Sequence, residues 1–238
     1  MTTSKRKLLQ QKTPLIKRYV RLRMRQNGKV IARFIMRRVL QIKERKRRQA
    51  LISTLAEFAT QAAKSRRYGF ESSAILFNLG FFFLIAERDI QAVKIDALTH
   101  PDAWERLLCA RIILLTIHEL DMDKVSGNKL REALADAGVS DESRQKSAQA
   151  LRIIRGAQQK AQKQFAFLRN ATIAHRDSDA LLQYRTITEI DEMAVLPIVS
   201  EFYQGTHMFL SLLPDLLIQV GAMSGLFNQI RAQANRRK

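Results

Sequence analysis

Residues 151–168, LRIIRGAQQKAQKQFAFL, decide the fold class of this chain. Apolar side chains recur in this segment in steps of three and four residues, the spacing that places them on one face of an α-helix. The resulting stripe is narrow, as it is in the seam between paired helices of a bundle. Its members are Leu151, Ile154, Ala157 or Gln158, Ala161, Phe165 and Leu168. We therefore expect an all-α protein in which this segment is a central bundle helix.

Helical patterns on both sides of this segment extend the prediction. The 238 residues include only nine glycines and four prolines, which suits long helices better than a turn-rich β architecture. Further helices are expected at residues 71–93, from Pro101-Asp102 onward, at 129–136, from Ser140 onward, and at 193–220 with a bend or break near Pro214. Residues 177–183 are expected to form a loop or an irregular turn, and residues 184–188 are ambiguous. Residues 231–238 are expected to be a frayed tail.

Positive charge is concentrated at the N-terminus. Residues 1–48 contain 18 Lys or Arg and one acid, whereas residues 49–238 contain 23 Lys or Arg and 21 Asp or Glu. This contrast predicts two parts, a basic arm (1–48) and a nearly neutral helical bundle (49–238). Pro14 and Asn27-Gly28 are expected boundaries in the arm. From there to about Tyr68 we expect one long helix, strongly basic in its first half and docked on the bundle in its second.

Composition excludes several classes of protein. The single cysteine, Cys109, rules out an intramolecular disulfide and a cysteine-rich zinc site, and its apolar neighbours predict that it is buried. The most apolar run, residues 74–86, is too short to cross a bilayer, and the N-terminus lacks the pattern of a signal peptide. A cytoplasmic protein without a cofactor or metal is therefore the expectation.

The segment from Arg169 to Asp177, RNATIAHRD, is where the chain carries chemistry. On a helix Arg169 and His175 differ by about 120°, with Thr172 between them and Arg176 almost over Arg169. His175 also continues the apolar stripe, so it would sit at the edge of a packed seam where neighbours tune its pKa.

Such a set of residues can cleave RNA without a metal. A base removes the proton of the ribose 2′-hydroxyl, and that oxygen then attacks the adjacent phosphate. An imidazole near neutral pKa can serve as base or acid, and a fixed guanidinium stabilises the charge that develops on the phosphate. The candidate catalytic residues are thus His175 and Arg169, with Asn170 orienting the histidine or bonding the phosphate.

At these residues the chain resembles the HEPN superfamily, whose mark is an arginine, a polar residue, a few more residues and a histidine. The resemblance is closest to the AbiU-like, abortive-infection branch and covers about residues 50–220, leaving the arm outside. The segments 110–121, ARIILLTIHELD, and 183–185, QYR, also resemble this branch.

The resemblance implies an all-α bundle of HEPN type, a symmetric homodimer with a composite cleft where the two motifs meet, and RNA cleavage that leaves a 2′,3′-cyclic phosphate. It also implies a role in phage defence or a toxin–antitoxin system, with an antitoxin or other regulatory protein as partner. In HEPN toxins silenced by adenylylation a tyrosine lies two residues after the histidine; Asp177 stands there in this chain, which argues against that control.

Other interpretations of the same residues stay open. Arg169 and His175 have a purely structural alternative, in which the arginine pairs with Asp177 or Asp179. Arg111 and His118 belong, with Thr172, Arg176 and Asp177, to a second tier of cleft candidates. His118 with Glu119, Asp121 and Asp123 invites a metal site, but the four histidines of the chain lack helical ligand spacing.

The basic arm has two candidate partners. Phosphate backbones are favoured, because 18 cations to one acid exceed what a solvated face needs and aromatic residues are sparse there. An anionic membrane is the less favoured rival, since Ile31, Phe34, Ile35 and Val39 make the helix amphipathic. If the motif is inactive, the chain would be a silent nucleic-acid-binding protein acting through this arm. The proposed phosphate-binding residues are Arg18, Arg21, Arg25, Arg33, Arg37, Arg38, Arg45, Arg47 and Arg48.

Overall fold

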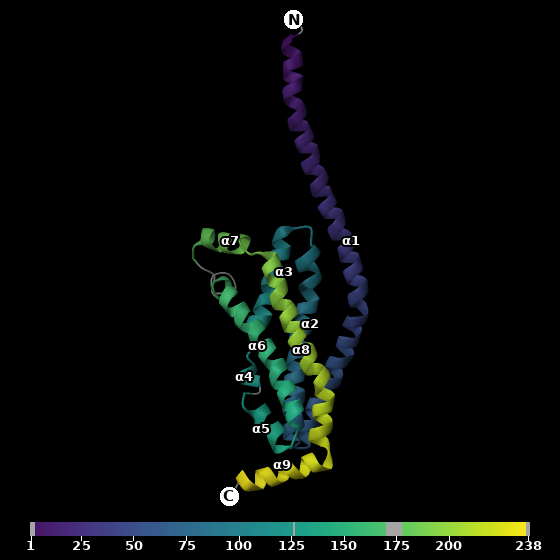
Figure 1. Ribbon diagram of the computed structural model, residues 1–238, viewed down its shortest axis with the longest axis vertical. Coiled ribbons are helices and arrows are strands. Elements are labelled where there is room, and N and C mark those ends of the chain that lie inside the picture. The colour runs from purple at the N-terminus through teal and green to yellow at the C-terminus, as the bar shows by residue number, and fades with distance from the viewer. Residues whose placement is uncertain (1–2, 126, 170–177, 237–238) are drawn as a thin grey trace.

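The protein is an all-α helical bundle with one helix that extends far beyond it (Figure 1). The computed structural model describes residues 3–125, 127–169 and 178–236, and most side chains from residue 28 on. In these ranges the chain forms nine helices and no strand. They are α1 (Thr3–Arg67), α2 (Glu71–Thr99), α3 (Ala103–His118), α4 (Met122–Val125), α5 (Lys129–Asp136), α6 (Asp141–Arg169), α7 (Ala180–Thr188), α8 (Glu192–Gly221) and α9 (Met223–Arg236).

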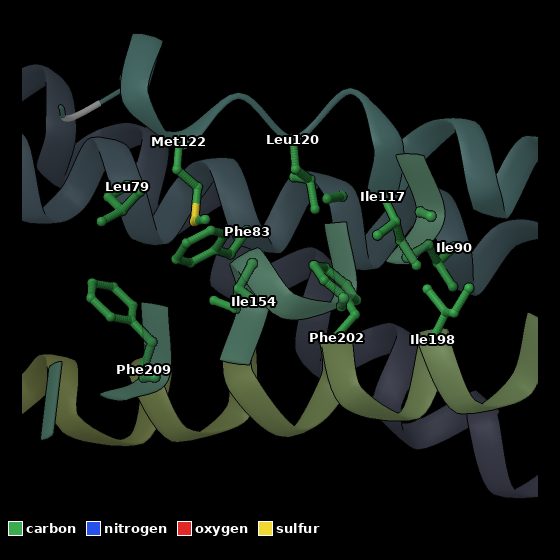
Figure 2. Close-up of a cluster of buried hydrophobic side chains, with 14 of the residues drawn as sticks. Leu79, Phe83, Ile90, Ile117, Leu120, Met122, Ile154, Ile198, Phe202 and Phe209 are labelled. Carbon is green, nitrogen blue, oxygen red and sulfur yellow. The ribbon is translucent and has the colours of Figure 1, made fainter. Parts of the chain in front are cut away.

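The core lies between α2, α3, α6 and α8. Figure 2 shows its centre, where Phe83 of α2 meets Phe209 of α8 edge-on at 5.3 Å between ring centres. The centre of the stripe predicted on α6 is confirmed, because Ile154, Ala157 and Ala161 are fully buried against α3 and α8. Burying a Leu, Ile or Phe side chain contributes about 1.5–3 kcal/mol, so these side chains fix how the four helices pack. Leu151 is half-buried, and the side chain of Leu168 lies outside the described residues.

Helix ends follow local chemistry. Gly69 ends α1 with a φ of 72°, and Gly138 follows α5 with a φ of 67°, a conformation that glycine adopts without steric cost. The carboxylate of Asp102 accepts a hydrogen bond from the backbone N–H of Trp104 at 3.0 Å and caps α3, which begins where the sequence predicted a helix start. Cys109 is buried as expected, and burial, with the nearby carboxylates of Asp96 and Glu105, raises the pKa of its thiol.

Two predicted boundaries in the arm are wrong. α1 is continuous from Thr3 to Arg67 and runs through both Pro14 and Asn27-Gly28. A proline inside a helix costs about 3 kcal/mol and Gly28 about 1 kcal/mol relative to alanine. Neither outweighs the good helix formers around it, since Arg, Lys, Gln, Met and Leu dominate the segment.

Three predictions near the C-terminus also need correction. Residues 180–183 are helical rather than a loop, because the carboxylate of Asp179 caps α7 by accepting from the N–H groups of Leu181 and Leu182 at 2.9 and 3.1 Å. α8 is not broken near Pro214; it ends at Gly221, and α9 turns away by 70°. α9 continues to Arg236, so most of the expected frayed tail is helical.

Candidate nucleic-acid interface

The Arg169-to-Asp177 motif begins where α6 ends. Arg169 is the last residue of α6, and Asn170, Thr172, His175, Arg176 and Asp177 lie outside the described residues. α7 starts at Ala180. The end of α6 and the start of α7 lie at one end of the bundle, which also carries the α2–α3 turn and the start of α8 (Figure 1). We call this the motif end.

The second-tier candidates on α3 lie at different depths of the bundle. Arg111 is buried, and its guanidinium lies 6.0 Å from the centre of the Trp104 ring. His118 is the last residue of α3, and its Nδ1 lies 3.2 Å from Oε1 of Glu119. The carbonyl of His118 accepts a hydrogen bond from Gln158 at 3.3 Å. Because Gln158 precedes Arg169 by 11 residues, about 16 Å of helix separates His118 from the motif end.

His118 instead lines a polar cleft between α3, α4 and α6. The cleft has a volume of about 570 Å³ and contains an ion pair of 2.7 Å between Arg155 of α6 and Asp123 of α4. Gln158, Gln159 and Gln162 line its α6 side. The described residues contain no group of three or more His, Cys, Asp and Glu side chains placed to hold a metal, here or elsewhere. The cleft is therefore a polar groove on the side of the bundle, away from the motif end.

An aromatic pair at the motif end was not foreseen as part of the site. The rings of Trp104 on α3 and Tyr184 on α7 stack with 6.3 Å between centres and 21° between planes. Trp104 is 42% exposed and Tyr184 57%, so the pair faces solvent in the described structure. The two residues are 80 positions apart in the chain, and no local pattern connects them. The only usable signal was that Trp104 is the single tryptophan of the chain.

The N-terminal half of α1 extends beyond the motif end (Figure 1). Arg18, Arg21 and Arg25 belong to this projecting part, where the backbone is helical and side chains are not described. Their positions on one continuous helix keep these charges in a row. Residues 3–36 of α1 are thus the projecting part of the basic arm (1–48).

The proposed phosphate-binding arginines nearer the bundle fall into two groups. Arg37 pairs with Asp96 at 2.7 Å and Arg47 with Glu87 at 2.6 Å, so both take part in docking α1 on α2. Arg38, Arg45 and Arg48 are exposed, and Arg38 lies 5.5 Å from the centre of the Phe34 ring on its own helix. Arg33 is half-buried. The exposed arginines are the ones best placed for phosphates.

A partly buried polar network fastens α1 to α2 and α8. Glu44 pairs with Lys94 at 2.8 Å and accepts a hydrogen bond from Gln91 at 3.1 Å. The cations of Arg47 and Lys94 lie 5.0 and 5.3 Å from the centre of the Tyr203 ring. Burial raises the pKa of Tyr203 above its usual value, so this phenol stays neutral and offers its ring face to the two cations. The network sets where the arm leaves the bundle.

The opposite side of α1 carries an exposed apolar stripe. Ile31, Phe34 and Ile35 are 57–60% exposed, Val39 is 45% exposed and Ile42 73%. On a helix these positions fall roughly opposite the docked residues Leu40, Glu44 and Leu51. No single helix in the described ranges is long and apolar enough to span a membrane; α8 and α9 qualify only together, as a pair bent by 70°.

Comparison with protein-family models, with curated proteins and with solved structures finds no match for this chain.

Proposed function

We propose that this chain is a metal-independent endoribonuclease of HEPN type. The observation that carries the proposal is the place where α6 ends. The helix with the narrow buried stripe, α6, ends at Arg169, at the end of the bundle beyond which the basic arm extends. RNA bound along the arm would therefore meet the motif first. A homodimer, an antitoxin or other regulatory partner, and a cytoplasmic role in phage defence belong to the same proposal.

In the proposed reaction His175 takes the proton of a ribose 2′-hydroxyl as the 2′-oxygen attacks the neighbouring phosphorus. A bond forms between the 2′-oxygen and phosphorus, and the bond to the 5′-oxygen breaks. That oxygen leaves with a proton returned by the imidazolium or by water, and the product ends in a 2′,3′-cyclic phosphate. Arg169 neutralises the charge on the phosphate oxygens, and Asn170 holds His175 or the phosphate in place.

The test is cleavage of total RNA by purified protein in the presence of EDTA, beside Arg169→Ala and His175→Ala. We expect wild type alone to degrade RNA and to leave cyclic phosphate ends. A matched control is Arg155→Ala, which removes an arginine from the same helix outside the motif. RNA that stays intact with the wild-type protein, or equal cleavage by the wild type and all variants, would contradict the nuclease proposal.

A silent nucleic-acid-binding protein is the alternative that uses the same arm. Its support is the uneven charge, 18 Lys or Arg and one acid in residues 1–48. In that case wild type, Arg169→Ala and His175→Ala all bind RNA with the same salt-sensitive affinity, and none cleaves it.

Attachment to an anionic membrane is the second candidate function for α1. It is favoured by the apolar stripe of residues 31–42, since exposed Ile, Val and Phe side chains find no partner on a phosphate backbone. Binding to vesicles of anionic lipid that RNA cannot displace would distinguish this function from the other two.

A further inference from the structure

We propose that Trp104 and Tyr184 form a stacking site for an unpaired base of single-stranded RNA. This inference rests on the proposed function and deepens it, because it names the form of RNA that the motif end accepts. The site, which we call the column, is a cluster of three neighbouring planar groups. The guanidinium of Arg111 lies 6.0 Å from the centre of the Trp104 ring, and the Tyr184 ring stacks on Trp104 at 6.3 Å.

Exposure increases along this column from the bundle to the solvent. Arg111 is 7% exposed, Trp104 42% and Tyr184 57%. The buried cation anchors the inner end, and Tyr184 presents the most exposed ring. A ring that already stacks on another in a favourable, nearly parallel geometry can add a further planar partner, and base–aromatic stacking works with any base because every base has a π-face.

The two rings are held in place before any ligand binds. Trp104 is in the first turn of α3, and its backbone N–H donates to the Asp102 carboxylate at 3.0 Å. The turn before it is tied by Arg106, whose guanidinium donates to the carbonyls of His100 and Pro101 at 2.9 and 3.2 Å. The Asp179 cap fixes the start of α7 below Tyr184. Little order therefore has to be gained on binding, which favours affinity.

The position of the column selects RNA as its occupant. Tyr184 follows His175 by nine residues, and α7 begins directly after the motif region. The arm extends beyond the same end, so its cations and the column complement the two parts of a nucleotide chain, phosphate and base. Inside a duplex each base is stacked between its neighbours, so a base within a strand can stack on Tyr184 only where it is unpaired.

The single tryptophan makes the site directly measurable, since all tryptophan emission comes from Trp104. The full-length protein is titrated with a short unstructured RNA carrying 2′-O-methyl groups, which cannot be cleaved, at a salt concentration that weakens the arm's contribution. We expect the oligonucleotide to change the emission of Trp104. Duplex RNA of the same length is expected to bind the arm, as anisotropy of a labelled strand reports, and to leave the emission unchanged.

Variants on the exposed face of α7 complete the test. Tyr184→Ala is expected to weaken single-strand binding by about five- to hundred-fold, the range for loss of one stacked base. Tyr184→Phe retains the ring and should retain affinity. Leu181→Ala is the matched control, because Leu181 is 56% exposed on the same helix and carries no ring.

Several outcomes would overturn the stacking site. The first three are an unchanged Trp104 emission when single strands are bound, an equal emission change with duplex RNA, and an unchanged RNA affinity of Tyr184→Ala. The fourth is an emission that depends on protein concentration alone, because this would mean that a second copy covers the column. Cleavage of ordinary RNA is scored separately. Cleavage without a Trp104 response refutes this site and leaves the nuclease standing, whereas a Trp104 response without cleavage does the reverse.

Discussion

Arg47 of α1 and Glu87 of α2 form an ion pair in which Nη2 and Oε1 are 2.6 Å apart, 40 positions apart in the chain. The side chain of Glu87 is only 11% exposed, while that of Arg47 is 48% exposed. The negative charge of the nearly buried Glu87 is therefore stabilised largely by Arg47. A cation that the sequence assigns to ligand binding thus also fastens the helix that bears it.

Removal of Arg47 should loosen α1. Arg47→Ala leaves the Glu87 carboxylate partly buried without this partner, which we expect to lower the free energy of unfolding by about 1–3 kcal/mol. Chemical denaturation measures the change. Arg45→Ala, two positions away and exposed, is the control and should alter stability by less than about 0.5 kcal/mol. Equal effects of the two substitutions would contradict the role of the pair.

The Glu44 carboxylate should make stability depend on pH. Burial acts to raise its pKa, but hydrogen bonds and charges from Lys94, Gln91 and Arg47 outweigh burial and lower the pKa below its ordinary 4.5. A lowered pKa means that the contribution is complete above pH 4.5 and is lost as the pH falls through the value in the folded protein. Glu44→Gln should be less stable than wild type at neutral pH, and the gap should shrink in acid.

The matched control for this pH effect is Glu57→Gln, an exposed position on the same helix. Unfolding free energies of the three proteins are compared at neutral pH and below pH 4.5. A gap between wild type and Glu44→Gln that stays constant across this range would show that the carboxylate charge plays no part.

Packing of α6 on α8 depends on Gly205. A Cβ atom there would lie 2.6 Å from Cγ1 of Ile154, 3.0 Å from its backbone nitrogen and 3.1 Å from the carbonyl oxygen of Ala150. Gly205→Ala is therefore expected to destabilise the fold by about 1–3 kcal/mol through overpacking. At Gly156 the nearest atom to a Cβ is Oε1 at the flexible end of Glu201, at 2.9 Å. Gly156→Ala should be neutral or stabilising, and thermal unfolding of both variants tests the contrast.

Charge on the arm should govern the salt dependence of RNA binding. Replacing Arg18, Arg21 and Arg25 together with glutamine is expected to reduce the slope of log affinity against log salt by about 2 for single strands, if each contacts a phosphate. The same number of substitutions at exposed cations of the bundle, Lys124, Arg144 and Lys146, controls for net charge. Equal slopes for the two triple variants would show that the arm does not contact the backbone.

Vesicle binding tests the apolar stripe of α1. Ile35→Asp places a charge in the stripe without touching a docked residue, since Ile35 is 57% exposed. If α1 binds anionic lipid, this variant should lose co-sedimentation with such vesicles while its RNA affinity falls little. If α1 binds only RNA, neither protein sediments with vesicles in the presence of excess RNA.

Regular periodicity made much of the fold predictable. The centre of the α6 stripe and the helix start at Pro101-Asp102 required only local chemistry, and both are confirmed. The prediction failed at Gly28, where one helix-breaking residue was given too much weight. It also failed at Asp179, where the N-terminal cap of a short helix was overlooked.

For the site, the local sequence predicted that Arg169 lies at the end of a bundle helix. It did not predict which residues from other helices lie near this end. The Trp104–Tyr184 column joins residues 80 positions apart, and the docking of Arg47 on Glu87 joins residues 40 apart. Such pairs arise from how helices pack, which no periodicity in one segment encodes. The roles of His175 and Asn170 stay predictions.

The continuous path of α1 through Gly28 has a consequence for encounter rates. Residues 3–36 form a single helix, which at 1.5 Å per residue measures about 50 Å. A stiff rod of that length, fixed at its base by the Glu44 and Arg47 network, enlarges the target that the protein offers to a diffusing polyanion. A flexible tail of equal charge would repel itself and sample many lengths, whereas the helix holds its cations at fixed spacing along one line. The stiffness of the helix, in addition to its charge, therefore sets how far from the bundle a polyanion is first bound.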